Sequence, residues 1–557
     1  MNRFLDMLRS TAATSSRGMV TGAPAAPVRR GWGDIHRQAR RMAAELAAGG
    51  VRPRDVVALL TADPAQVAPA VQAVWLAGGT VTLLQQPTAR TDLGEWSRDT
   101  LRVLATTGAE LVLTGDDFAA VAPALTGQGI AHRPLSELLH LAADPAEPAG
   151  GGEGTGERGG HAEPVLPPPP GEDDLALLQL TSGSVSAPKA VMISHRNLHA
   201  NITGMDQVSA LDPDRDVVVS WLPLFHDMGL INLLITPMAL GLELVKSTPA
   251  DFLGSPLSWA TLISEYRGTV TGAPNFGYAL LTRALARVPD GDALDLSSLR
   301  LALNGAEPID VASVGAFTTA GARFGMPAAC IRPAYGMAEA TVAVSAAPLF
   351  TGLSTDRLGE DTFARLGPPL PGLEASVVDG TGAPVGDRTV GRLRLRGTSI
   401  ARGYLTADGP APLTDEEGWL DTGDLGYLVD GEIVVCGRAK DVIIVGGRNL
   451  YPTDIERAAD SVAGVRAGNV VAVRLDAGAR RESFAVAAES RHHGDPEQER
   501  LLRSLITTRV VDALGARPAS VHIVAPGTLP KTSSGKLRRS SAVRLVTAPP
   551  VTEPPAA

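Results

Sequence analysis

The stretch from Asp174 to Leu198 constrains the fold more than any other part of this sequence. Its apolar runs, 175–180 and 190–193, are short enough for buried strands, and Ser194 stands where a helix N-cap is expected. Between the runs lies TSGSVSAPK, which is rich in hydroxyl groups and ends in Lys189. A loop of this kind between two strands directs N–H and O–H donors to one point, which favours phosphate binding. Alone, it would more often be a solvated turn.

Short apolar runs alternate with amphipathic stretches in the first part of the chain. Expected strands cover 56–60, 81–84 and 111–113, and expected helices cover 34–49, 64–76 and 96–106. Such alternation is typical of an α/β fold with a largely parallel sheet.

Changes in the pattern of expected helices and strands predict how the later part of the chain divides into domains. A β-rich subdomain is expected around 373–397. After Arg438 the pattern becomes α+β, and Thr453 to Glu456 match a capping box. We predict an α/β protein with a large N-terminal domain, residues 1–439, of parallel-rich sheets layered with helices plus this subdomain. A small, mobile α+β lid domain would span 440–546. The Gly- and Pro-rich residues 142–173 predict a flexible loop, and 547–557 a disordered tail.

Composition limits the class of protein. Lys and Arg number 50 against 60 Asp and Glu, a net charge of −10, which disfavours nucleic acid or an anionic membrane as main partner. The two cysteines, Cys330 and Cys436, form neither a disulfide framework nor a metal-ligand spacing. The start of the chain lacks the apolar core of a signal peptide, and no apolar run reaches the ~18 residues of a membrane span. We expect a cytoplasmic protein without integral membrane association.

Six motifs, taken together and in this order, resemble the acyl-adenylate-forming superfamily. They are TSGS…PK (181–189), WLPLFHDMGL (221–230), NGAEPI (304–309), YGMAEAT (335–341), DTGDLGYL with CGRAKDVIIVGGRNLYPTDIE (421–428 and 436–456) and LPKTSSGKLRR (529–539). Within the superfamily the motifs are most similar to fatty acyl-AMP ligases and actinobacterial long-chain fatty acyl-CoA synthetases. The resemblance implies that a carboxylate attacks the α-phosphate of ATP, expelling pyrophosphate, and that a thiol then takes the acyl group.

The resemblance also implies a nucleotide site. The hydroxyl loop and its lysine would hold the β- and γ-phosphates, two glycine-containing segments would form the adenine pocket, an aspartate would accept the ribose hydroxyls, and an arginine would contact the nucleotide again. In that order the residues are Thr181, Ser182, Gly183, Ser184 and Lys189; Gly305, Ala306 and Glu307 with Tyr335, Gly336 and Met337; Asp424; and Arg438.

Five positions would carry the chemistry and the motion. Glu339 matches the carboxylate that holds Mg²⁺ against the phosphates. Lys536 matches the C-terminal lysine that neutralises charge on the transferred phosphate. Lys440 lies at the hinge position, and Gly446 and Gly447 would line the thiol tunnel. ATP and Mg²⁺ are therefore the expected cofactors, with CoA or a phosphopantetheine carrier as co-substrate.

The acyl site is expected at two further segments. His226 resembles the family's gate residue near the carboxylate, while Phe225, Asn275 and Phe276 would contact the acyl chain. The apolar residues 231–240 suit a hydrophobic acid better than an amino acid. The predicted substrate is a hydrophobic carboxylic acid, by default a medium or long fatty acid, with polyketide, terpenoid and aryl acids as alternatives.

The sequence features point to different acceptors for the acyl group, some to an acyl carrier protein and some to CoA. The motifs look like fatty acyl-AMP ligases, which load acyl carrier proteins and usually carry an insertion after YGxAEAT. Here only residues 342–366 separate that motif from GPPLPG, and Gly446-Gly447 resembles the CoA ligases. Both acceptors stay open, with a lean toward a carrier protein.

The phosphate loop departs from the family pattern TSGSTGxPKG at Val185, Ser186 and Ala190. Losing a donor to a phosphate oxygen could cost about 1–3 kcal/mol. One alternative is therefore a non-adenylating ligase that uses preformed acyl-AMP. Another is a non-catalytic acyl-adenylate or nucleotide binder. Retention of Lys189, Glu339, Asp424 and Lys536 together argues against a pure binder.

Overall fold

The computed structural model describes residues 1–22, 26–87, 91–142, 164–181, 188–289, 291, 293–359, 361–445, 448–476, 482–531 and 537–547. Six predicted site residues lie outside the described residues: Ser182, Gly183, Ser184, Gly446, Gly447 and Lys536. Most of the predicted linker, 143–163, and the end of the predicted tail, 548–557, lie outside them as well.

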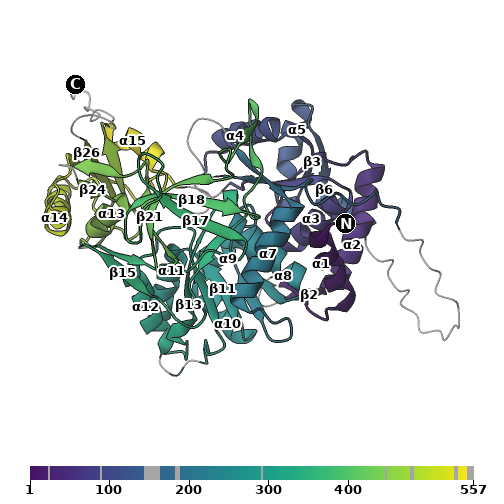
Figure 1. Ribbon diagram of the computed structural model, residues 1–557, viewed down its shortest axis with the longest axis horizontal. Helices are drawn as coiled ribbons and strands as arrows, with labels where there is room; N and C mark the ends of the chain where they lie inside the picture. The colour runs from purple at the N-terminus through teal and green to yellow at the C-terminus, as the bar shows by residue number, and fades with distance from the viewer. Residues whose placement is uncertain are drawn as a thin grey trace.

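Two eight-stranded sheets form the main body of the protein (Figure 1). Their inner strands run parallel, whereas β2, β14, β8, β19 and β20 join antiparallel. The first sheet has the order β14 (Ala343–Ala346), β13 (Ile331–Gly336), β12 (Leu301–Asn304), β11 (Val270–Ala273), β9 (Val217–Ser220), β10 (Glu243–Lys246), β1 (Gly18–Thr21), β2 (Val28–Gly31). The second has the order β20 (Gly409–Pro412), β19 (Gly403–Thr406), β8 (Ala190–Ser194), β7 (Leu175–Leu180), β4 (Thr80–Leu83), β3 (Val56–Leu60), β5 (Ala109–Thr114), β6 (Ala131–Pro134).

Four smaller sheets complete the described strands. One antiparallel sheet has the order β17 (Leu373–Val378), β18 (Gly391–Gly397), β21 (Leu420–Val429), β22 (Glu432–Arg438), which matches the expected β-rich subdomain. The others pair β15 (Thr355–Leu358) with β16 (Asp361–Ala364), β23 (Ile443–Val445) with β24 (Arg448–Leu450), and β25 (Val470–Leu475) with β26 (Ser483–Glu489) and β27 (Ser520–Val524).

Helices cover the sheets. Those of the main body are α1 (Arg3–Thr14), α2 (Trp32–Ala48), α3 (Pro64–Leu76), α4 (Leu93–Thr107), α5 (Ala122–Gly127), α6 (Leu135–Leu141), α7 (His195–Ser209), α8 (Thr236–Leu240), α9 (Pro249–Gly254), α10 (Leu257–Glu265), α11 (Asn275–Leu285) and α12 (Val311–Ala322). A π-helix spans Met228–Ile235, and α13 (Pro452–Asp460), α14 (Pro496–Leu514) and α15 (Arg539–Thr547) follow later. Among the described helices, none is both long and apolar enough to cross a membrane.

Several elements match the sequence prediction to the residue. β3, α3 and β7 have the predicted bounds, and the Ser194 side chain caps α7 by accepting from the Asn197 amide. Helix α3 is apolar on all sides, and Asp63 and Pro64 start it. It is therefore buried, and its Trp75 indole donates to the Ala176 carbonyl of β7 at 2.8 Å.

The predicted capping box at Thr453 is wrong. Helix α13 begins at Pro452, and the side chain of its N-cap residue, Tyr451, makes no capping hydrogen bond. Glu456 instead forms an ion pair with Arg539 at 2.6 Å and accepts from the Ala472 amide at 3.0 Å. Contacts with residues distant in the sequence thus take the place of the expected hydrogen bond between Glu456 and the start of the helix.

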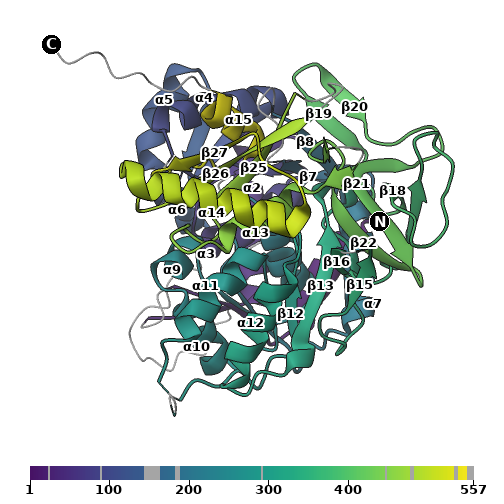
Figure 2. The same ribbon diagram turned by 90° about the vertical axis from the view of Figure 1, so that its left-hand side faces the viewer.

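The chain after residue 440 has hydrophobic cores of its own. Two buried clusters consist entirely of residues from Ile443 onward, whereas the largest cluster contains none beyond Leu413. Both views show α13, α14, α15 and β26 gathered at one end of the molecule (Figures 1 and 2). This organisation fits the predicted lid domain over 440–546, although the boundary itself stays a prediction.

Candidate active site

Asp424 on β21 is the most buried carboxylate among the predicted nucleotide-binding residues. It is 3% exposed and accepts a hydrogen bond from the Tyr335 hydroxyl of β13 at 2.5 Å. Its neighbour across β21 and β22 is Arg438, whose Nε lies 2.9 Å from Asp424 Oδ1. Because the pair of β21 and β22 meets a strand of another sheet here, Tyr335 comes together with two predicted residues that follow it by more than 80 positions in the sequence.

Burial has the largest effect on the pKa values of Asp424 and Tyr335. It raises the pKa of Asp424, despite the opposing effects of Arg438 and of the Tyr335 hydrogen bond. Burial also raises the pKa of Tyr335, and the nearby Asp424 raises it further. The phenol therefore stays a proton donor, so Asp424 is held by donors on two sides.

Glu339, Tyr404 and Lys189 form a second group. The Tyr404 hydroxyl donates to Glu339 Oε1 at 2.6 Å, and Lys189 Nζ lies 5.3 Å from the centre of the Tyr404 ring. Tyr404 reaches this place because β19 pairs with β8, which begins directly after Lys189 (Figure 2). Burial, followed by the charge of Glu339, raises the pKa of Tyr404.

The two groups act on each other electrostatically. The positive charge of Arg438 lowers the pKa of both Asp424 and Tyr404, and the negative charge of Glu339 raises the pKa of Asp424. Thr181, at the end of β7, donates its amide to the Lys189 carbonyl at 3.3 Å. The described edge of the phosphate loop therefore adjoins the carboxylates, an arrangement suited to a ligand carrying both hydroxyl and phosphate groups.

Glu339 is the described residue predicted to hold a metal ion. Within the described ranges, no group of three or more His, Cys, Asp or Glu residues could hold a metal. Mg²⁺ is commonly bound through one or two carboxylates together with substrate phosphates, because it keeps several waters. A single carboxylate beside a phosphate loop fits that mode of binding.

The adenine segments are shaped by close backbone contacts. A Cβ on Gly336 would lie 2.0 Å from the Val342 carbonyl oxygen, so only glycine fits there. Ala306 has a φ of +67°, an unusual conformation for a residue with a side chain. Glu307 accepts from the Phe276 amide at 2.9 Å, and Met337 Sδ lies 3.7 Å from the Tyr335 hydroxyl. The NGAEP segment thus contacts the predicted acyl segment, whereas the contact of Met337 with Tyr335 lies within the YGM segment itself.

The predicted acyl residues follow two parallel strands: Phe225 lies in the loop after β9, and Asn275 and Phe276 begin α11 after β11. Phe276 packs edge-on against Trp221, with ring centres 6.0 Å apart. The Phe225 carbonyl accepts from Gln179 of β7 at 3.0 Å, and His226 Nδ1 lies 2.7 Å from Asp227. The loop carrying Phe225 and His226 is therefore fixed to the sheet that also carries the phosphate loop.

Two buried polar atoms in this region have no hydrogen-bond partner in the described part of the chain. They are Trp221 Nε1 and Asn304 Oδ1. Asn304 donates to Asn275 Oδ1 at 2.8 Å, and a Cβ on Gly277 would lie 2.9 Å from the Trp221 ring. Both unpaired atoms thus belong to residues that contact the first turn of α11.

Two predictions find no place in these groups. Lys440 is exposed, and its carbonyl accepts a 3.4 Å hydrogen bond from Arg474. Residues 231–240 belong to the π-helix and α8, where nearly all are buried in the main core. Conversely, Tyr404 and Gln179 were not predicted from the sequence, since the strand pairings that place them are not visible in local patterns.

Known proteins are similar to this chain over most of its length. A family model described as AMP-binding enzyme matches residues 12–405. A Mycobacterium tuberculosis protein named as a ligase is 47% identical over 98% of this chain and all of its own length. Long-chain-fatty-acid–AMP ligase FadD26 of Mycobacterium marinum is 35% identical, covering 66% of this chain and 69% of its own. A structure from a study of fatty acyl-adenylate ligases from E. coli and L. pneumophila has a TM-score of 0.84 at 30% identity, covering 98% of this chain and 97% of that one.

Proposed function

Because the chain belongs to the family of AMP-binding enzymes and is an acyl-adenylate-forming ligase, we propose that it activates a hydrophobic carboxylic acid, by default a fatty acid. ATP is the second substrate, and the products of this step are acyl-AMP and pyrophosphate. The observation that carries the proposal is the meeting of Tyr335, Asp424 and Arg438, at hydrogen-bonding distance, close to the carboxylate of Glu339.

In this proposal the group around Asp424 and the group around Glu339 bind different parts of the nucleotide. Asp424 accepts the ribose hydroxyls, because a carboxylate has acceptor sites beyond those used by Tyr335 and Arg438. Gly305, Ala306 and Glu307, with Gly336 and Met337, enclose the adenine. Glu339 would hold Mg²⁺, which when bound neutralises charge on the triphosphate.

Cationic side chains would neutralise the negative charge that develops on the phosphates during adenylation. Lys189 and the hydroxyl loop at Thr181 to Ser184 grip the phosphates, while Lys536 approaches the α-phosphate from the lid domain. His226 orients the attacking carboxylate. Lys440 is proposed as the hinge that lets the lid move between the two half-reactions.

The acyl chain would extend along Phe225, Asn275 and Phe276. The edge-on contact between Phe276 and Trp221 provides an apolar surface near the end of β9. The 35% identity to a long-chain-fatty-acid–AMP ligase supports a fatty acid as the first acid to test.

Acyl transfer to a phosphopantetheine thiol is the proposed second step. We favour an acyl carrier protein over CoA, because the motifs most resemble fatty acyl-AMP ligases and FadD26 is named as a ligase of that type. Gly446 and Gly447 would leave room for the pantetheine arm in either case.

Product analysis by mass spectrometry tests both steps. The enzyme is incubated with ATP, Mg²⁺, a mixture of fatty and aryl acids, CoA and a holo carrier protein. The proposal predicts acyl-AMP from a fatty acid and a thioester on the carrier. A thioester formed only from synthetic acyl-AMP would instead identify a ligase that does not adenylate, as the substitutions at Val185, Ser186 and Ala190 allow. Absence of any product with either donor would contradict enzymatic acyl transfer.

A further inference from the structure

Lys246 is a buried lysine that the proposed chemistry does not use. It ends β10 and is 2% exposed. Its ammonium donates to the Leu222 carbonyl at 2.7 Å and to the Ser247 carbonyl at 2.9 Å. Burying a lysine is costly, and here burial lowers its pKa to about 7.

The Leu222 carbonyl belongs to the loop that carries Phe225 and His226. Three residues further on, the Phe225 carbonyl accepts from Gln179 of the other large sheet. The loop is therefore held at one end by β10 through Lys246 and at the other by β7 through Gln179. The Ser220 carbonyl, just before the loop, also accepts from the Ser247 amide at 3.0 Å.

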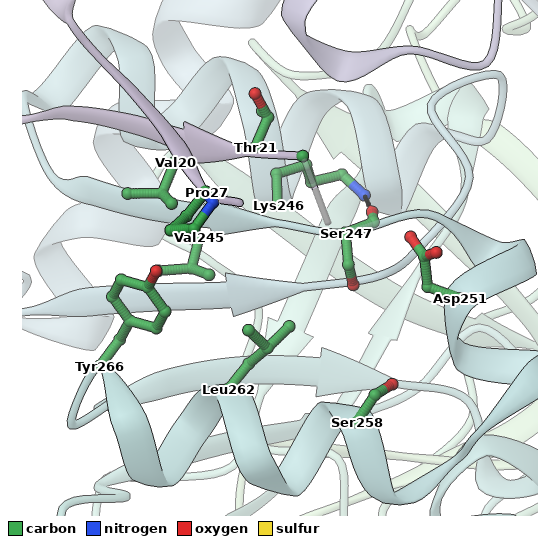
Figure 3. Close-up of a pocket in the computed structure, with 11 residues that line it drawn as sticks. Val20, Thr21, Pro27, Val245, Lys246, Ser247, Asp251, Ser258, Leu262 and Tyr266 are labelled. Atoms are coloured by element: carbon green, nitrogen blue, oxygen red, sulfur yellow. Dashed lines mark hydrogen bonds between the residues drawn. The ribbon is translucent and has the colours of Figure 1, made fainter. Parts of the chain in front are cut away.

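Lys246 lies at the wall of a small cavity (Figure 3). Ser258 and Leu262 of α10 line the opposite wall, and Asp251 of α9 lies beside Ser247. The negative charge of Asp251 favours the ammonium form of Lys246. An apolar side chain of similar length would avoid the desolvation cost, so filling space does not account for a lysine.

We propose that Lys246 is a positioning residue that fixes the loop of residues 221–227, and thereby Phe225 and His226, for binding of the carboxylic acid. The proposal deepens and rests on the proposed function. In this arrangement one side-chain nitrogen donates to the carbonyl groups of Leu222 and Ser247, which sets the path of the chain before His226.

The test compares Lys246→Met, which keeps the length of the side chain, with the wild-type enzyme. Acid-dependent pyrophosphate exchange should show the KM for the acid raised about tenfold, because charged hydrogen bonds are lost. The KM for ATP should change less than about twofold, since no nucleotide contact is altered. Lys246→Gln, which retains an N–H donor without charge, should give an intermediate acid KM.

Ser258→Ala is the matched control, because Ser258 lines the same cavity but lies on α10, outside the loop and the proposed nucleotide-binding residues. It should leave both KM values unchanged. A Lys246→Met protein with the wild-type acid KM, or with both KM values raised equally, would overturn the proposal. If that variant does not fold, the same comparison is made with Lys246→Gln.

Hydrogen exchange separates this inference from the proposed function, because it needs no activity. Amides of residues 221–227 should exchange faster in Lys246→Met than in wild type or Ser258→Ala. Unchanged exchange would count against Lys246 even if acids are activated. Faster exchange in an enzyme that activates no acid would support the loop contact and refute the function.

Discussion

Asp424 is a carboxylate whose burial has opposite consequences for binding and for stability. Burial raises its pKa, so the folded state holds its proton more tightly than the unfolded chain does. Its contribution to stability is therefore present below the unfolded pKa of about 4 and is lost as the pH rises through the folded value. At neutral pH the charged form costs stability, which is consistent with a residue kept for ligand binding.

Asp424→Asn should separate these two effects. The amide keeps the shape but presents N–H donors to hydroxyl donors, so the KM for ATP should rise roughly 10- to 100-fold. The thermal midpoint at pH 7 should not fall, because the cost of a buried charge is removed. The control is Asp421→Asn on the same strand, whose side chain is 45% exposed and pairs with Arg392. Equal ATP KM values in the two variants would contradict the ribose role.

Lys246 should make the stability of the protein depend on pH in the direction opposite to that of Asp424. Its folded pKa, lowered to about 7, lies below the unfolded value, so the unfolded chain binds more protons between about pH 7 and 10. Stability should therefore rise with pH in this window, by at most about 1.4 kcal/mol per pH unit. Burial raises the pKa of Cys330 and Cys436 to about 12, so these thiols oppose the rise only above about pH 9.

Denaturant melts of wild type and Lys246→Met between pH 7 and pH 9 check this prediction. The difference in unfolding free energy, wild type minus variant, should grow with pH. A constant difference would show that Lys246 is charged in the folded state throughout this range.

Among the helices and strands, local sequence patterns predict the bounds of those segments whose tertiary contacts do not compete with the local ones. The bounds of α3 follow from the Asp63-Pro64 start, the apolar run and the Gly78-Gly79 stop, and those of β7 from its apolar run. The pattern fails at Thr453, where Glu456 pairs with Arg539, which is 83 residues away in the sequence. Such partners depend on tertiary structure, which no local pattern contains.

In the candidate site, too, local motifs predict some residues, whereas others depend on tertiary structure. The motifs singled out Tyr335, Asp424, Arg438, Glu339 and Lys189, and the structure brings these five into two adjoining groups. Tyr404 links two of them but lies in a segment without a distinctive motif. Its position depends on the pairing of β19 with β8, strands separated by more than two hundred residues.

One ion pair joins α13 to the main body. Arg457 Nε lies 2.9 Å from Asp310, which also caps α12 by accepting from the Ser313 amide at 2.9 Å. Asp310 follows the adenine segment by three residues, so the pair connects the predicted lid to the nucleotide region.

Arg457→Ala should loosen this contact without unfolding the protein. Because the Arg457 side chain is 48% exposed, the loss in stability should stay below about 1 kcal/mol. Amides of α13 should exchange faster with solvent, as measured by mass spectrometry. Arg503→Ala, which removes an ion pair with Glu499 within α14, is the control. Identical α13 exchange in wild type and Arg457→Ala would show that the ion pair does not restrain the lid.

At the scale of the whole molecule, the separate cores predict that the main body folds without the lid. A fragment of residues 1–439 retains the whole of the largest core. It loses Val442 and Tyr451, which pack against Tyr427 and Cys436. We expect a cooperative thermal transition within a few degrees of the full chain, and loss of adenylation because Lys536 is absent. A fragment that does not fold would place the domain boundary elsewhere.

In the proposed first step, the carboxylates of Asp424 and Glu339, the phosphate loop and Lys536 of the lid together activate a hydrophobic acid with ATP. Acid-dependent exchange of labelled pyrophosphate into ATP measures this step directly, before any acceptor thiol is needed. We expect exchange with medium- or long-chain fatty acids, and its loss in Lys536→Ala but not in Lys531→Ala. No exchange with any acid of a broad panel, under conditions where ATP binds, would contradict it.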